Sequence, residues 1–329
     1  MPRTALPEAL PRFLEPMLLR AGLPPAEQPE RWVLELKWDG MRAQLRIAGD
    51  GTWCLRSRPG RACSDQFPEL ADLAEAVCDR AILLDGELVC LGADGRPDFH
   101  RLRRRLSATN ARAARSLAIT HPATLIVFDV LHLDGCAVRA LPYAERRDLL
   151  ARELPTTGTS WRIPSPLRGE LDAILAVTRA HQLEGVVAKR LESPYEPGRR
   201  NGAWLKHKHR RRETFAVTGW RPASPHAGRP DTILIARRRP DGTLIPAGSA
   251  ELGLSADERE QLRTALDQRH IETRRGSHRV AHGIWVDIDY QGDRSAPPRD
   301  AIMRALRIEG EPARGSALDA DVAPLTARR

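Results

Sequence analysis

The chain has 329 residues, which at about 150 residues per domain predicts roughly two domains. Hydrophobic residues make up 41% and charged residues 29%, and no apolar run approaches the ~20 residues of a membrane span. A membrane protein, a collagen and a largely disordered chain are therefore excluded. The five cysteines form no C-x-x-C pair, which disfavours a disulfide framework or a four-cysteine zinc site. The formal charge of +9 favours DNA or RNA as a partner, although many basic proteins have no such partner.

Only four of the 52 basic side chains are lysines, and the rest are arginines. Arginine stays protonated and is no amine nucleophile, whereas lysine can lose its proton, so the lysines are the candidates for covalent chemistry. The alternative is that a few lysines persist by chance. The four lysines of the chain are Lys37, Lys189, Lys206 and Lys208.

The first strand predicted along the chain is Arg31–Gly40, where polar and apolar residues alternate. One face carries Glu35, Lys37 and Asp39, and the other face is apolar and suits a core. On this segment alone, a solvated strand face with a surface ion pair is the favoured interpretation.

Two later strands carry acidic side chains. The run 82–89 places Asp85 and Glu87 on one side, and the run 125–131 is apolar except for Asp129. A carboxylate inside a buried strand is costly without a partner or a purpose. Between these strands, residues 101–118 form a basic stretch that is either a phosphate-binding surface or a solvated arginine-rich helix or loop.

The remaining lysines lie on two further predicted strands, which follow an amphipathic helix predicted for Gly169–His181. The run 183–189 begins beside Glu184 and ends at Lys189. Lys206 and Lys208 share one face of the run 204–208, and two like charges side by side are unfavourable unless an anion lies between them. Together the strands present amines, carboxylates and one aromatic ring, a set that suits nucleotidyl transfer to a lysine amine.

Six segments in order resemble the motifs of the covalent nucleotidyltransferases, a superfamily of DNA ligases, RNA ligases and mRNA capping enzymes. They are Lys37-Trp-Asp-Gly40 with Arg42 (motif I), Ser57-Arg-Pro-Gly60 (motif Ia), Asp85-Gly-Glu87 (motif III), Phe128-Asp129 with Asp134-Gly135 (motif IIIa), Glu184-Gly-Val-Val-Ala-Lys189 (motif IV) and Lys206-His-Lys208 (motif V).

The flanking segments resemble bacterial ATP-dependent DNA ligases, both free-standing enzymes and the ligase modules of end-joining proteins. These segments are Glu35-Leu-Lys-Trp-Asp-Gly40, Phe67-Pro-Glu-Leu70 and Gly202-Ala-Trp-Leu-Lys206. The resemblance disfavours the NAD-dependent ligases, because they are about twice as long and carry a cysteine zinc finger, which the spacing of these cysteines does not allow.

The region after Arg212 contains short β patterns at residues 214–220, 232–236 and 243–247, with a hairpin turn at Pro240-Asp-Gly242. Ser255 and Glu258 predict the start of a helix that runs to about Gln268, and residues 284–290 alternate as a late strand.

The resemblance implies an α+β fold in which a nucleotidyltransferase domain of ATP-grasp-like antiparallel sheets and helices precedes a C-terminal OB-fold β-barrel. The expected boundaries are 1–210 for the adenylation domain and 211–314 for the OB-fold, with 315–329 as a flexible tail.

The resemblance also implies three chemical steps and a role for each motif residue. Lys37 attacks ATP to form a lysyl-AMP, the AMP moves to the 5′-phosphate of a DNA break, and the 3′-hydroxyl then seals the strand. The roles implied are adenine binding by Glu35 and Phe128, ribose contacts by Arg42, Arg58 and Glu87, metal binding by Glu87 and Glu184, and α-phosphate contacts by Lys189, Lys206 and Lys208.

The implied cofactors are ATP and Mg²⁺, with Mn²⁺ as an alternative metal, and the implied partner is nicked or broken duplex DNA. A Ku-type end-binding protein is a partner by analogy. A monomer acting in DNA repair at the nucleoid of the cytoplasm is expected, with no membrane association. The alternatives are an RNA or other polynucleotide ligase, and a DNA-binding scaffold with weakened catalysis.

One motif departs from the family pattern. Motif VI usually reads R-x-D-K, whereas the best match here has Arg307 and Glu309 followed by Gly310 in place of the lysine. Arg299 and Arg304 are candidates to supply the missing charge. We expect slow self-adenylation but near-normal sealing of a nick that is supplied already adenylated.

Overall fold

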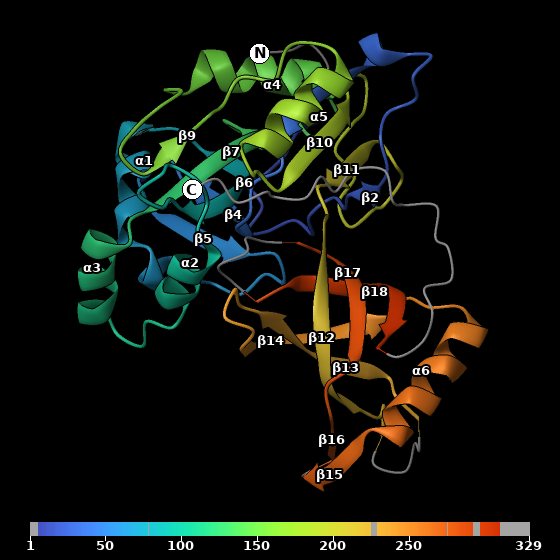
Figure 1. The fold of residues 1–329 in the computed structure, drawn as a ribbon. Coiled ribbons are helices and arrows are strands. Elements are labelled where there is room, and N and C mark those ends of the chain that lie inside the picture. Colours follow the sequence, from blue (N-terminus) through green and yellow to red (C-terminus); the bar gives the residue numbers. More distant parts are fainter. Residues whose placement is uncertain (1–5, 78, 225–228, 275, 292–296, 310–329) are drawn as a thin grey trace, which may run out of the picture. The chain divides into compact units, whose positions relative to one another are not determined.

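Figure 1 shows the fold in a computed structural model that describes residues 6–77, 79–224, 229–274, 276–291 and 297–309. The chain divides into two compact units, Met1–His209 and Arg210–Arg329. Gly310 and the tail expected at 315–329 lie outside the described residues. No helix in the described ranges is both long enough and apolar enough to cross a bilayer.

The first unit contains a larger and a smaller sheet, and most neighbouring strands in both are antiparallel. The larger sheet has the order β1 (Leu6–Pro7), β8 (Cys136–Ala137), β7 (Ala123–Leu133), β6 (Ile82–Cys90), β4 (Met41–Ile47) and β5 (Trp53–Ser57), with β9 (Trp161–Arg162) paired in parallel to β7. The smaller sheet has the order β2 (Arg20–Ala21), β11 (Trp204–Lys208), β10 (Gly185–Arg190) and β3 (Trp32–Leu36).

Helices of the first unit cover one face of each sheet. They are α1 (Ala71–Ala76), α2 (Phe99–Leu106), α3 (Ala111–Thr120), α4 (Tyr143–Glu153) and α5 (Leu171–Ala180). On the smaller sheet, Ile174 and Leu175 of α5 pack against Leu34, Val186 and Leu205. Because alternate residues of a strand point to opposite faces, this packing directs Glu35, Lys189 and Lys206 to the face away from α5.

The second unit is a single sheet whose pairings close on themselves. The sheet contains β12 (Arg211–Arg221), β13 (Thr232–Arg238), β14 (Leu244–Leu252), β15 (His270–Arg274), β16 (Ser277–Val280), β17 (Ile284–Gln291) and β18 (Arg299–Ile308). β12 pairs with β13, β13 with β14, β14 with β18 in parallel, β18 with β17, and β17 again with β12. Helix α6 (Ala256–Gln268) follows β14, and the hairpin β15–β16 joins the sheet at β12.

Several sequence-based predictions are confirmed in these elements. The predicted helix after Ser255 is α6, and it begins with a capping box in which Ser255 and Glu258 bond to each other's backbone N–H. The Pro240-Asp-Gly242 turn joins β13 to β14, and the helix predicted at residues 169–181 is α5. The strand predicted at Arg31–Gly40 is shorter than expected, because β3 ends at Leu36, whereas β6, β7 and β12 extend beyond their predicted ranges. The sequence-based predictions did not include β4, β5 and β18.

Candidate functional site

Polar side chains collect on the face of the smaller sheet that lies away from α5. β10 lies between β11 and β3 and pairs with both. In this register Lys208 lies opposite Gly185, and Lys206 and Glu35 lie on either side of Val187. Lys37 directly follows β3, and its backbone N–H donates to the Gly185 carbonyl at 3.0 Å. Three lysines from distant parts of the sequence, two in β11 and one directly after β3, therefore lie close together.

A single carboxylate joins two of these lysines. The Lys37 Nζ lies 2.8 Å from Glu184 Oε2, and the Lys208 Nζ lies 3.3 Å from Glu184 Oε1. The pKa of Lys206 is lowered by burial and by the positive charges of Lys208 and Lys37. Two ammonium groups thus contact one carboxylate and a third, that of Lys206, lies within electrostatic reach of it. The excess positive charge suits a phosphate-bearing ligand.

Glu87 brings a second carboxylate to the same place from the larger sheet. Burial raises the pKa of Glu87 to about 8; the charges of Glu184 and Asp85 raise it as well, while Lys37 and Arg42 lower it. Glu87 and Glu184 therefore both lie within electrostatic reach of Lys37.

The two carboxylates fit a metal that is shared with a nucleotide. The described residues contain no group of three or more His, Cys, Asp and Glu side chains that could hold a metal by themselves. Mg²⁺ is commonly held by one or two carboxylates together with substrate phosphates and water. Glu87 and Glu184 meet that requirement, and a bound cation would favour the ionised form of Glu87.

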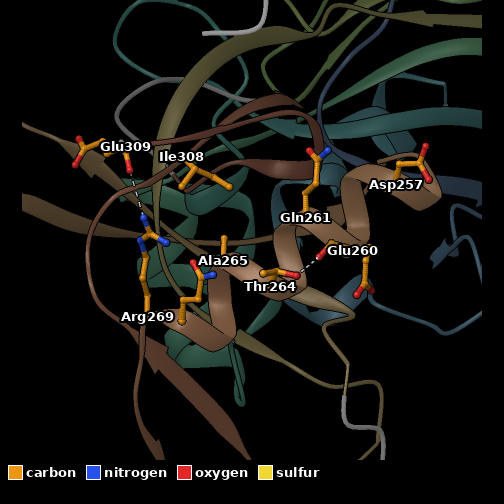
Figure 2. A pocket seen from close by; sticks show the side chains of 9 residues that line it. Asp257, Glu260, Gln261, Thr264, Ala265, Arg269, Ile308 and Glu309 are labelled. Atoms are coloured by element: carbon orange, nitrogen blue, oxygen red, sulfur yellow. Dashed lines mark hydrogen bonds between the residues drawn. The ribbon is translucent and has the colours of Figure 1, made fainter. Parts of the chain in front are cut away.

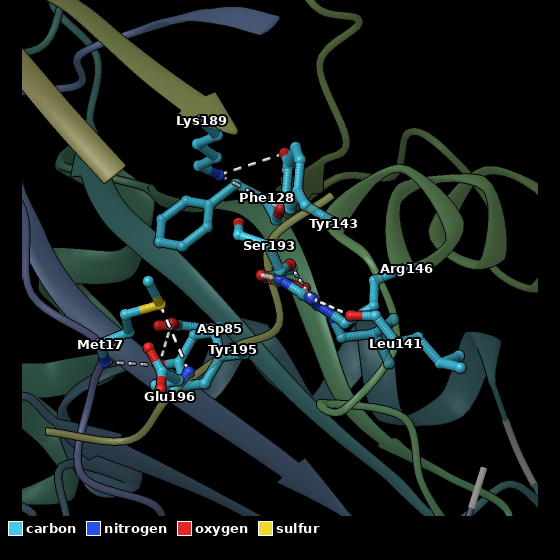
Figure 3. Close-up of polar contacts among 12 residues, drawn as sticks. Met17, Asp85, Phe128, Leu141, Tyr143, Arg146, Lys189, Ser193, Tyr195 and Glu196 are labelled. Atoms are coloured by element: carbon cyan, nitrogen blue, oxygen red, sulfur yellow. Dashed lines mark hydrogen bonds and ion pairs between the residues drawn. The ribbon is translucent and has the colours of Figure 1, made fainter. Parts of the chain in front are cut away.

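Arg42 is held rigidly beside Glu87, its partner in the β4–β6 register. Its guanidinium donates to both oxygens of Asp85, at 3.1 and 2.7 Å, and to the Met17 carbonyl at 2.6 Å. Tyr195 also donates to Asp85, at 2.7 Å (Figure 3). Arg58 follows β5 with its side chain exposed, and its backbone N–H donates to the Arg42 carbonyl at 3.0 Å.

Lys189 occupies an aromatic cage (Figure 3). Its Nζ lies 2.8 Å from Glu35 Oε2 and 3.2 Å from the Tyr143 hydroxyl, which also donates to Glu35. The rings of Phe128, Tyr143 and Trp204 surround the ammonium, with centroids at 4.2, 4.7 and 4.5 Å. Burial lowers the pKa of Lys189, against the opposing effect of Glu35. The structure therefore brings Lys189 to Glu35 and Phe128.

Sequence reasoning missed Tyr143 and Tyr195, the two tyrosines that hold carboxylates of the lysine site. The chain has three tyrosines, and all three are buried. Each donates a hydrogen bond to a carboxylate, in the pairs Tyr143–Glu35, Tyr195–Asp85 and Tyr290–Glu213. The scarcity of tyrosine in this sequence was the signal that could have drawn attention to them.

Asp129 has a structural partner. Its carboxylate accepts two hydrogen bonds from Arg146 of α4, at 2.8 and 2.9 Å, and both side chains are completely buried. This ion pair explains how the strand tolerates a charge that the sequence analysis singled out as costly.

A hollow of about 490 Å³ lies in the second unit, between α6 and the end of β18 (Figure 2). Among the described residues, its lining includes Asp257, Glu260 and Glu309 and one basic side chain, Arg269. The hollow therefore lacks the cations that a nucleotide requires.

Residues 16–208 match the family model described as an ATP dependent DNA ligase domain. The "Multifunctional non-homologous end joining DNA repair protein LigD" of Mycobacterium tuberculosis is 35% identical over 262 residues, which cover 79% of this chain and 32% of that protein. The chain thus spans about a third of the length of this relative. "DNA ligase C1" of Mycolicibacterium smegmatis is 32% identical over 77% of this chain and 72% of that protein.

A solved structure agrees with these relatives. The structure of "mycobacterial DNA ligase D complexed with ATP and MES" shares 30% sequence identity, with a TM-score of 0.54, over 90% of this chain and 95% of that chain. The match of the family model covers more than half of the chain and contains every element of the lysine site described above. The chain therefore belongs to the ATP-dependent DNA ligase family.

Proposed function

We propose that the protein is an ATP-dependent DNA ligase that seals breaks in duplex DNA through a lysyl-AMP intermediate. The observation that carries the proposal is the placement of Lys37, which lies beside Glu184 and Lys208 at the meeting point of β3, β10 and β11. Membership of the DNA ligase family supports the substrate, and the ATP named in the solved relative supports the nucleotide.

The first step follows from the contacts of Lys37. Its amine must lose a proton before it can attack, and Glu184, which accepts its hydrogen bond, is placed to receive that proton. A bond then forms between Nζ and the α-phosphorus while the bond to pyrophosphate breaks. Lys206 and Lys208 stabilise the negative charge on the phosphates. Mg²⁺ or Mn²⁺ held by Glu87 and Glu184 would neutralise further phosphate charge.

The other motif residues form the nucleotide site in this proposal. Glu35 and Phe128 contact the adenine, and Arg42, Arg58 and Glu87 contact the ribose and its surroundings. Because Lys189 is paired with Glu35 inside the aromatic cage, we propose that it holds Glu35 beside the base and leaves the α-phosphate to Lys206 and Lys208.

For the second unit we propose an OB-fold that closes on DNA. An OB-fold is a five-stranded Greek-key barrel, and the ring of β12, β13, β14, β18 and β17, with α6 after its third strand, supports this assignment. The proposed boundaries remain 1–210 and 211–314. We further propose that the protein acts as a monomer on nicked or broken duplex DNA of the nucleoid, with a Ku-type protein as a partner at ends.

The test is covalent labelling with ATP that carries a radioactive α-phosphate. We expect the wild-type protein to become labelled and Lys37→Arg to remain unlabelled, because a guanidinium stays protonated. The matched control is Arg152→Lys, which exchanges the same two residue types at an exposed position of α4 and should label normally. A labelled Lys37→Arg protein would refute the role of Lys37. An unlabelled wild-type protein that binds nicked duplex would support the scaffold alternative instead.

A further inference from the structure

Helices α2 and α3 lie next to each other in the first unit (Figure 1) and carry six arginines but no acidic residue. The buried side chains of α2 include Leu102, which belongs to the core under the larger sheet. The core of that sheet lies on the face opposite Arg42 and Glu87, so the two helices do not line the lysine site.

Two of the six arginines have structural roles. Arg105 is completely buried, donates to both oxygens of Glu69 at 2.6 and 2.8 Å, and also donates to the His121 carbonyl at 2.9 Å. Arg101 is half-buried and donates to the Leu91 carbonyl at 3.2 Å. These contacts anchor α2, and each of the two charges also faces a carboxylate, Glu69 for Arg105 and Asp98, at 3.8 Å, for Arg101.

The other four arginines point to solvent. Arg103 and Arg104 on α2, and Arg112 and Arg115 on α3, are all exposed. Among the ion pairs between described residues, none involves any of these four side chains. We call this set, Arg103, Arg104, Arg112 and Arg115, the α2–α3 arginine surface.

Arg112 and Arg115 are three positions apart on α3 and are therefore neighbours on its surface, where like charges repel and destabilise the free protein unless an anion compensates them. The effect of the basic helices is visible at His121, whose pKa is lowered by burial and by the charges of Arg101, Arg104 and Arg105. Asn110, whose side-chain oxygen caps α3 by accepting from the Ala113 N–H at 2.9 Å, also carries an amide NH2 group, which is a donor suited to phosphate oxygens.

We propose that the α2–α3 arginine surface binds the phosphodiester backbone of duplex DNA, on a stretch that flanks the break; this inference rests on the proposed ligase function. Duplex DNA offers a dense row of phosphates, and arginine is well suited to phosphate recognition. A lipid surface fits less well because Ile119 is the single large apolar side chain that is exposed on the two described helices.

The test compares two full-length variants that lose the same charge. In the first, the α2–α3 arginine surface is replaced by Arg103→Gln, Arg104→Gln, Arg112→Gln and Arg115→Gln. In the control, four other exposed arginines of the first unit are replaced by Arg152→Gln, Arg162→Gln, Arg168→Gln and Arg179→Gln. Affinity for a nicked duplex is measured without ATP over a series of salt concentrations.

We expect the slope of log affinity against log salt to fall by about 3 to 4 in the first variant, because each phosphate contact contributes roughly 0.9. The control should lose less than about 1. Labelling by ATP should be unchanged in both, since neither set touches the lysine site. The half variants Arg103→Gln/Arg104→Gln and Arg112→Gln/Arg115→Gln should each lose about half of the slope, which separates lost contacts from misfolding.

Three results would overturn the inference: an unchanged slope in the first variant, an equal fall in both variants, or a loss of binding to phosphatidylserine vesicles with DNA binding retained. These results are distinct from failure of the proposed function. The proposed function fails if the wild-type protein does not become labelled, whether or not it binds nicked duplex.

Discussion

The buried ion pair between Asp129 and Arg146 leads to a prediction that separates a structural role from a catalytic one. We expect Asp129→Asn to destabilise the first unit strongly while leaving self-adenylation intact at low temperature. Asp129 lies next to Phe128 in the same motif, so the sequence alone does not distinguish the two roles.

The contacts of the pair set the size of the effect. Both side chains are completely buried, and Asp129 Oδ1 also accepts from the Val130 N–H at 2.9 Å. The substitution leaves the Arg146 guanidinium buried without its counter-charge, and its remaining acceptors, the carbonyls of Leu141 and Ser193, are neutral. Breaking a buried pair in this way costs about 3–5 kcal/mol. At about 2–4 °C per kcal/mol for a unit of this size, the Tm should fall by about 6–20 °C.

The assay is thermal unfolding followed by circular dichroism, with ATP labelling at 20 °C on the same samples. Asp148→Asn, an exposed carboxylate on α4, is the control and should leave the Tm unchanged. The apolar double variant Asp129→Leu/Arg146→Met should recover part of the loss, because it removes both charges. A Tm within about 2 °C of wild type, which is less than 1 kcal/mol by the same conversion, would refute the reasoning, as would lost labelling at an unchanged Tm.

Three further predictions concern the lysine site and the altered motif. The pKa of Glu87 is about 8 in the folded chain, against an ordinary value of 4.5 in the unfolded chain, so the folded state binds an extra proton between these pH values. The stability of the protein should therefore decline as the pH rises through this range, and Glu87→Gln should flatten the Tm profile there. A decline that persists in the variant would assign the effect to other groups. In Gly185→Ala the new Cβ would lie 2.0 Å from the His207 carbonyl oxygen, so labelling should be lost, whereas Gly51→Ala, also at positive φ but with open space, should label normally; normal labelling of Gly185→Ala would contradict this. Without the motif VI lysine, the activation free energy of self-adenylation should be higher by about 2–4 kcal/mol, while sealing of a pre-adenylated nick stays near normal. Gly310→Lys should therefore speed self-adenylation alone. Fast wild-type adenylation that the added lysine does not improve would show that nearby arginines suffice.

Local features of the sequence were sufficient to place much of the site on its elements. The two-residue period of a strand put Lys206 and Lys208 on one face of β11, and the register of the smaller sheet agrees. The same period placed Glu35 and Lys37 on one face, but β3 ends at Leu36, so the register includes Glu35 and not Lys37. Ser255 marked the start of α6 for the same reason, since a helix cap depends on a few adjacent residues. The order of the motifs identified the family before any spatial arrangement was known.

The tertiary structure decided which charged groups meet. Lys37 pairs with Glu184, which is 147 positions away in the sequence, and Lys189 lies with Glu35 in an aromatic cage that no motif foretold. The sequence indicated one continuous basic stretch at 101–118. In the structure, Arg105 of this stretch is buried and anchors α2, whereas four of its arginines are exposed. Periodicity fixes the face of an element on which a side chain lies, whereas its partner depends on strand register and helix packing between distant segments, which burial of the whole core determines.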